Sequence, residues 1–163
     1  MYIEMINVAI TEDEAAAAER LERAVRGWAE ARGQTVSVAR YPDAKSLLSC
    51  GRTFDLVFMD IGLPDMSGMD AARALRARGD DCVLVFCTTM AQFAVEGYSV
   101  NAFDYLVKPV DRASLDITLD GAARLVDRKR REDIAVRTAD GGTRRGKRVS
   151  LATLRAGALK PAA

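Results

Sequence analysis

The chain of 163 residues contains no histidine and only three cysteines, and both shortages narrow the chemistry it can carry out. Without histidine, imidazole acid–base catalysis and histidine metal ligation are excluded. Cys50, Cys82 and Cys87 lack a metal-like spacing, and the last two share one apolar run. We therefore expect small core residues in a reducing cytoplasm rather than a thiolate metal site.

Long apolar stretches are also missing. No run approaches the roughly 20 residues of a membrane-spanning helix. The first ten residues include Glu4 and lack the basic segment and cleavage site of a signal peptide. No Gly-rich phosphate loop follows the first apolar segment, which argues against a nucleotide-binding enzyme. We expect a cytoplasmic protein with no membrane partner.

The charges are unevenly distributed along the chain. Residues 1–126 carry a net charge of −6, whereas residues 127–163 carry +7. With 49% hydrophobic residues, the length fits one ordinary domain and a short appendage. We therefore predict an acidic globular domain over residues 1–131 and a basic tail over residues 132–163.

Five short apolar segments alternate with five amphipathic patterns. The predicted strands are residues 5–10, 35–39, 56–59, 82–87 and 102–107. The predicted helices are residues 15–31, 42–50, 67–78, 91–98 and 111–131, the fourth being short and carrying Ala91, Ala94, Val95 and Tyr98. This alternation predicts an α/β fold, a five-stranded parallel sheet with helices on both faces in a flavodoxin-like three-layer sandwich.

The most informative stretch surrounds Asp60. The apolar run Leu56–Met59 is typical of a strand buried on both faces, and Asp60 ends it. Gly62 then breaks the pattern, and Ser67 is placed to cap the next helix. Asp60 is thus expected at the carboxyl end of a central strand, where open α/β sheets place their binding sites.

Other predicted strands also end in polar residues of particular kinds. They are Glu12 and Asp13 after the first strand, Thr88 after the fourth and Lys108 after the fifth. Taken singly, each could be a helix-terminal acid, a cap or a surface lysine. Together at one sheet edge with Asp60, the acids repel one another unless a hard cation such as Mg²⁺ joins them. The hydroxyl and the ammonium would then suit a phosphoryl group.

Two long sequence motifs contain several of these residues. The segments LVFMDIGLPDMSG and VLVFCTTMAQFAVEGYSVNAFDYLVKP, with the acidic pair before them, resemble the receiver domain of two-component response regulators over roughly residues 4–130. The second segment is most similar to receivers of the LytTR (LytR/AlgR) class. The resemblance implies a CheY-like fold and a switch rather than a turnover enzyme.

The resemblance also implies a role for each residue of the site. Asp60 would accept a phosphoryl group from a sensor histidine kinase. Glu12, Asp13, Asp60 and the backbone carbonyl of Gly62 would bind Mg²⁺. Thr88 and Lys108 would contact the phosphoryl group, and Thr88 with Tyr105 would form the switch pair. A homodimer through the fourth helix, fifth strand and last helix would follow.

Three positions depart from the usual receiver pattern. The acidic pair begins with Glu12 rather than aspartate, so the metal geometry is expected to differ. Gly62 offers no side chain where many receivers influence dephosphorylation, and Thr89 replaces a common alanine and is expected to crowd the entry to Asp60. A phosphatase that uses an aspartyl phosphate usually has a second acid at the position of Gly62, which disfavours that alternative.

The tail supports two interpretations. The segment DIAVRTADGGTRRGKRVSLATLR resembles the opening hairpin of a LytTR DNA-binding domain, with its turn at residues 139–142. Such a domain needs about 100 residues, and 31 follow Glu132. We therefore expect a disordered basic remnant, and DNA binding in transcription regulation only where the LytTR region is complete. The alternative is a stand-alone receiver that acts through protein contacts.

Overall fold

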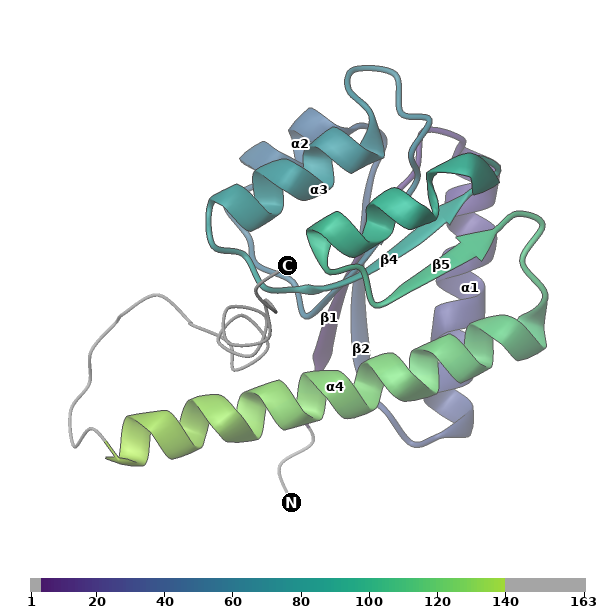
Figure 1. Cartoon of the computed structure of the whole chain (residues 1–163). Helices are drawn as coiled ribbons and strands as arrows, with labels where there is room; N and C mark the ends of the chain where they lie inside the picture. Colours follow the sequence, from purple (N-terminus) through teal and green to yellow (C-terminus); the bar gives the residue numbers. More distant parts are fainter. Residues whose placement is uncertain (1–3, 140–163) are drawn as a thin grey trace.

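The computed structural model describes residues 4–139 and contains one parallel sheet with the strand order β2-β1-β3-β4-β5 (Figure 1). The strands are β1 (Ile6–Thr11), β2 (Val36–Tyr41), β3 (Leu56–Met59), β4 (Val83–Thr88) and β5 (Asp104–Val107). The helices are α1 (Ala15–Ala31), α2 (Ala44–Ser49), α3 (Gly68–Ala77) and α4 (Arg112–Ala139), with the 3₁₀ helices η1 (Ala91–Phe93) and η2 (Val95–Val100).

Two apolar layers enclose the sheet, which confirms the predicted three-layer sandwich. On one face, α1 and α4 pack against residues such as Val8, Phe58 and Val85. On the other face, α2, α3 and η2 cover Val57 and Phe86. β3 and β4 are buried along their whole length, which explains why their sequences are continuously apolar.

The fourth predicted helix differs from its expected form. It consists of η1 and η2, and the predicted apolar stripe fails because Val95 and Tyr98 are 78% and 83% exposed. Gly97 and Val100 face the core instead. The two lie three residues apart, which places them on one side of a 3₁₀ helix, whereas the prediction assumed the α-helical period.

The last helix is longer than the sequence predicted. It continues past residue 131 to Ala139, since no glycine or proline interrupts the chain between residues 122 and 140. Lys129 donates to the carbonyl of Asp81, and Arg130 donates to Asp55 at 2.8 Å, so both tie the helix to the amino edge of the sheet.

This extension corrects part of the tail prediction. Residues 133–139, which the hairpin resemblance would make a strand, are helical. The rest of the proposed hairpin and of the basic tail lies outside the described residues, so the domain division near residue 131 stays a prediction. No helix within residues 4–139 has the length and apolarity needed to cross a membrane.

The start of α3 determines where the backbone of Asp60 lies. Ser67 caps the helix by accepting a hydrogen bond from the Asp70 N–H at 3.0 Å. The N–H of Gly68 donates to the carbonyl of Ile61 at 2.9 Å. A Cβ at Gly68 would lie 2.0 Å from the carbonyl oxygen of Asp60, so only glycine permits this approach.

We predict that Gly68→Ala destabilises the fold by about 1–3 kcal/mol, because the new methyl group forces α3 away from the Asp60 backbone. Urea unfolding measures the change. Gly97→Ala is the matched control, because a Cβ there would meet its nearest neighbour at an ordinary 3.5 Å. Equal stability of the two variants would contradict the argument.

Candidate functional site

Backbone hydrogen bonds between neighbouring strands hold the polar residues of the carboxyl edge in place. The N–H of Asp60 donates to the carbonyl of Thr11 at 3.0 Å, which links the ends of β3 and β1. The N–H of Lys108 donates to the carbonyl of Thr88 at 2.8 Å, which links the ends of β5 and β4. The predicted convergence of these residues therefore follows from the strand order.

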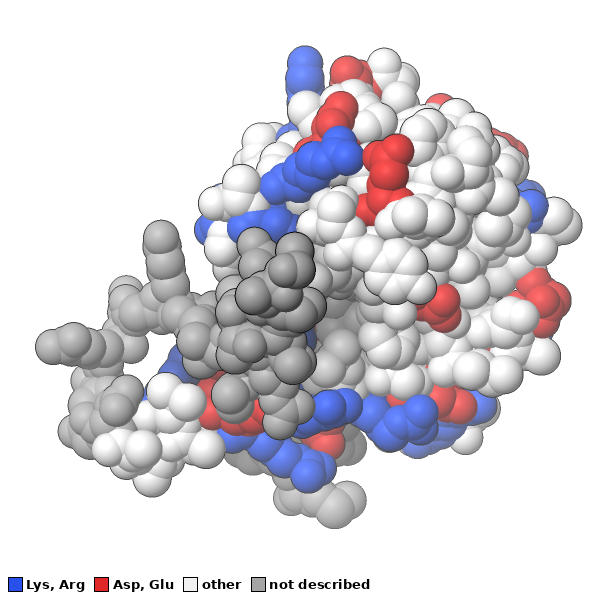
Figure 2. All heavy atoms as spheres, viewed as in Figure 1, with Lys and Arg blue, Asp and Glu red and all other residues white. Residues whose placement is uncertain are grey.

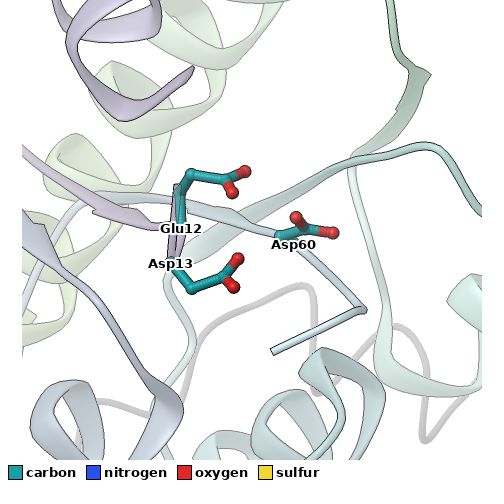
Figure 3. Close-up of side chains that lie close together, drawn as sticks. All are labelled: Glu12, Asp13 and Asp60. Atoms are coloured by element: carbon teal, nitrogen blue, oxygen red, sulfur yellow. The ribbon is translucent and has the colours of Figure 1, made fainter. Parts of the chain in front are cut away.

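Three carboxylates meet at this edge (Figure 3). One oxygen from each of Glu12, Asp13 and Asp60 lies within 4.8 Å of the others. Glu12 is buried and Asp13 is exposed, so the cluster opens to solvent on one side. An all-oxygen donor set of this kind fits a hard divalent cation such as Mg²⁺ better than a softer metal.

Gly62, the fourth predicted ligand, lies in the loop after Asp60. Its N–H donates to the Asp60 Oδ1 at 3.2 Å, which holds the carboxylate against the loop backbone. The methyl carbon of Met90 lies 3.4 Å from the position that a Cβ on Gly62 would take. The absent side chain of Gly62 thus leaves room for Met90 beside the acidic cluster.

Lys108 is the cation of the site. Its Nζ donates to the Glu12 carboxylate and, at 3.2 Å, to the Asp60 Oδ2. Burial opposes its charge, but the bond to Glu12 and the charge of Asp60 outweigh burial and hold the pKa of Lys108 above its ordinary value. The ammonium group is therefore retained at neutral pH.

The pKa values of the two carboxylates beside Lys108 are shifted in opposite directions. Burial raises the pKa of Glu12 above its ordinary value despite the Lys108 hydrogen bond. For Asp60, burial also acts upward, but the hydrogen bond with Thr88 and the charge of Lys108 lower its pKa. Of these two residues, Asp60 is thus held more firmly as a carboxylate, which is the form that attacks an electrophile.

The predicted switch residues are joined through one residue that the sequence did not single out. The Thr88 Oγ1 accepts a hydrogen bond from the Met90 N–H at 3.3 Å, and the Tyr105 hydroxyl donates to the Met90 carbonyl. Tyr105 also packs on Phe86, with 5.6 Å between the ring centroids. Nothing in the residue type of Met90 indicated this role, because its backbone makes both bonds.

Thr89 is the residue that was expected to crowd the entry to Asp60. It is exposed and lines a cavity beside Lys108, between α1 and the segment that joins β5 to α4. No hydrogen bond between Thr89 and Asp60 is formed in the described part of the chain. Crowding of the entry to Asp60 stays a prediction.

The fold and the site define a class of protein, namely parallel α/β domains with an acidic pocket and a lysine at the carboxyl edge. The sequence pattern of the response regulator receiver domain matches residues 8–120. The chain therefore belongs to the response regulator receiver family, as the resemblance implied.

Relatives of known function agree with this assignment. The chain is 35% identical over 119 residues to the positive alginate biosynthesis regulatory protein of Pseudomonas aeruginosa, covering 73% of this chain and 48% of that protein. It is 32% identical over 81 residues to the sensory transduction protein LytR of Staphylococcus epidermidis, covering 50% of this chain and 32% of that protein. The chain thus spans about half the length of these relatives or less.

Solved structures share the fold. The response regulatory domain of protein mrkE from Klebsiella pneumoniae has a TM-score of 0.69 at 23% identity, covering 76% of this chain and 99% of that one. The signal receiver domain of a Luxo repressor protein from Vibrio parahaemolyticus has a TM-score of 0.67 at 19% identity, covering 81% and 98%. At these identities the likeness supports the fold alone.

Removing the Tyr105 hydroxyl tests the bond to Met90. We predict that Tyr105→Phe lowers the free energy of unfolding by about 0.5–1.5 kcal/mol, because the Met90 carbonyl loses a half-buried donor. Chemical denaturation measures the loss. Tyr98→Phe serves as the control, because Tyr98 is 83% exposed; losses of equal size would contradict the assignment.

Proposed function

We propose that Asp60 accepts a phosphoryl group from the phosphohistidine of a sensor histidine kinase, within a cytoplasmic response regulator of the LytR/AlgR type. The observation that carries this proposal is the Asp60 carboxylate, with the Lys108 ammonium at 3.2 Å and a lowered pKa. The relatives named as regulators favour transcription regulation as the output. The chain would act as a switch rather than as a turnover enzyme.

The transfer itself exchanges one bond for another. An Asp60 oxygen attacks phosphorus, the P–N bond to the donor imidazole breaks, and the released imidazole keeps the electron pair and takes a proton. Lys108 is placed to neutralise charge on the phosphoryl oxygens, and the Thr88 hydroxyl can donate to one of them. Glu12, Asp13 and Asp60 would hold Mg²⁺, which supplies charge neutralisation when bound.

Phosphorylation would act on the switch pair through charge. The phosphoryl group adds about −1.5 to −2 charges at pH 7. Thr88 now accepts from the Met90 N–H, so a rotation of its side chain that carries the Oγ1 toward the new oxygens would break that bond. Met90 also accepts from Tyr105, so a shift of the Met90 backbone would reposition η1 and β5.

We predict that Asp60→Asn abolishes phosphoryl incorporation from a small acyl phosphate in the presence of Mg²⁺, because the amide is not a nucleophile. Intact-protein mass spectrometry measures the added mass. Asp70→Asn, which alters an exposed carboxylate on the neighbouring helix α3, should leave the yield unchanged. An unchanged yield in Asp60→Asn would refute the acceptor assignment.

Thermal melts test the metal site. We predict that millimolar Mg²⁺ raises the melting temperature, because a ligand of the native state alone stabilises it by mass action. Asp13→Asn should remove the rise, since it deletes a ligand from the exposed side of the cluster. Lys108→Gln should enlarge it, because the ammonium group competes for Glu12 and Asp60. The same rise in all three proteins would count against the site.

A second copy is the partner that we propose for the face formed by η2, β5 and α4. Figure 2 looks onto this face, where uncharged atoms predominate over η2 and β5. Its exposed apolar residues are Val95, Tyr98, Phe103, Val107 and Ile117. Exposed apolar residues that lie together commonly mark an interaction site.

We predict that beryllofluoride, as a phosphoryl mimic, shifts the chain toward a dimer in sedimentation experiments. Val107→Lys should prevent the shift by placing a charge in the apolar face. Ile134→Lys is the control, since Ile134 is 58% exposed near the end of α4 and lies about 25 Å along the helix from Ile117, at 1.5 Å per residue. A chain that stays monomeric with the mimic would refute this partner.

A further inference from the structure

A cavity of about 370 Å³ lies between α1 and the segment that leads from β5 into α4. Ala17, Leu21 and Ala24 of α1 form one wall, and Pro109, Val110 and Leu115 form the other. Two of the four α1 residues that line the cavity are alanines, whose short side chains leave space. Its volume falls within the roughly 300–1,000 Å³ of typical small-molecule sites.

Apart from Arg20, Thr89 and Lys108, the residues that line the cavity are apolar. Cys87 of β4 lines it, and burial raises the pKa of that thiol to about 11. The thiol is therefore neutral at physiological pH and behaves as a small apolar group. This apolar lining suits a hydrocarbon body.

The polar groups of the cavity are Arg20, Thr89 and Lys108. Lys108 is already bonded to Glu12 and Asp60. Arg20 is 69% exposed, and its guanidinium lies 3.9 Å from Glu14, a distance too long for a strong pair. Among the lining residues, Arg20 is thus the cation that remains available, and its planar group suits a carboxylate.

We propose that this cavity binds a small amphipathic carboxylate, such as a medium-chain fatty acid. The carboxylate would pair with Arg20, and the hydrocarbon chain would lie between the apolar walls beside Leu21 and Leu115. An alcohol with the same hydrocarbon chain should bind more weakly, because it has no carboxylate to pair with Arg20. A short acid should also bind more weakly, because it leaves the apolar walls in contact with water.

The position of the cavity gives such a ligand a route to the site. Lys108 and Pro109 form part of its lining, so an occupied cavity restrains the Lys108 stem while its ammonium group faces Asp60. The ligand is then expected to raise the rate of Asp60 phosphorylation at least threefold by holding Lys108 in place. This part of the inference rests on the proposed function, whereas binding itself does not.

Titration with decanoate below its micelle concentration, followed by amide chemical shifts, tests the binding. We expect saturable binding with shifts at Leu21, Thr89 and Leu115. Each buried methylene contributes roughly fourfold in affinity, so hexanoate should bind at least tenfold more weakly. Decanol should also bind more weakly, because it leaves Arg20 unpaired.

Matched variants on α1 give the controls. Ala17→Leu fills the cavity and Arg20→Gln removes the charge, and each should weaken decanoate binding at least tenfold. Ala16→Leu and Arg23→Gln alter exposed positions of the same helix outside the cavity and should bind as the unaltered chain does. Binding unchanged by Ala17→Leu and Arg20→Gln, or no saturable binding, would overturn the proposal.

Asp60→Asn separates the two parts of the inference. Decanoate should bind this variant as it binds the unaltered chain, even if Asp60 is not the phosphoryl acceptor. The rate at which a small acyl phosphate phosphorylates the unaltered chain, measured with and without decanoate, then tests the coupling. Binding without a change in rate would keep the ligand site and reject the coupling.

Discussion

The structure depends on the confinement of three carboxylates at the carboxyl edge of the sheet, two of which are bonded to one lysine. Two like charges about 4 Å apart repel by about 4 kcal/mol at an effective dielectric constant near 20. Lys108 offsets part of this repulsion by bonding to both Glu12 and Asp60. The arrangement is therefore stable only with a cation beside it, which makes the edge sensitive to any added or removed charge.

The rest of the fold holds these charges in place. Because β1, β3, β4 and β5 are neighbours in the sheet, the residues that directly follow these four strands lie next to one another. Continuous apolar packing on both faces of β3 and β4 fixes the register, because slippage would bury polar loop residues. Gly68 then lets α3 approach the Asp60 backbone, so the acceptor is set on a rigid strand end rather than on a mobile loop.

The sequence predicted the sheet and the convergence of Glu12, Asp13, Asp60 and Lys108 at its carboxyl edge, because both depend on where a strand ends and which side chain follows it. It did not predict Met90, whose role comes from its backbone N–H and carbonyl and so leaves no trace in residue type. The 3₁₀ form of η2 was missed for a similar reason: Gly97 and Val100 give too short a pattern to separate two helical periods. The end of α4 was predicted too early: Val126 is its last buried residue, yet no glycine or proline stops the helix before Ala139.

Few hydrogen bonds separate Asp60 from the face formed by η2, β5 and α4, so a change at Asp60 would have a short route to that face. Met90 joins Thr88 to Tyr105. Asp104, the residue before Tyr105, accepts a hydrogen bond from the Thr118 hydroxyl of α4. η2 is the weakest element in this region, because 3₁₀ hydrogen bonds are poorly aligned and only two of its residues are buried. An element with so little buried surface can rearrange at low cost, whereas the core strands cannot. The 3₁₀ turns are therefore the part of the domain best suited to convert a charge at Asp60 into a new surface.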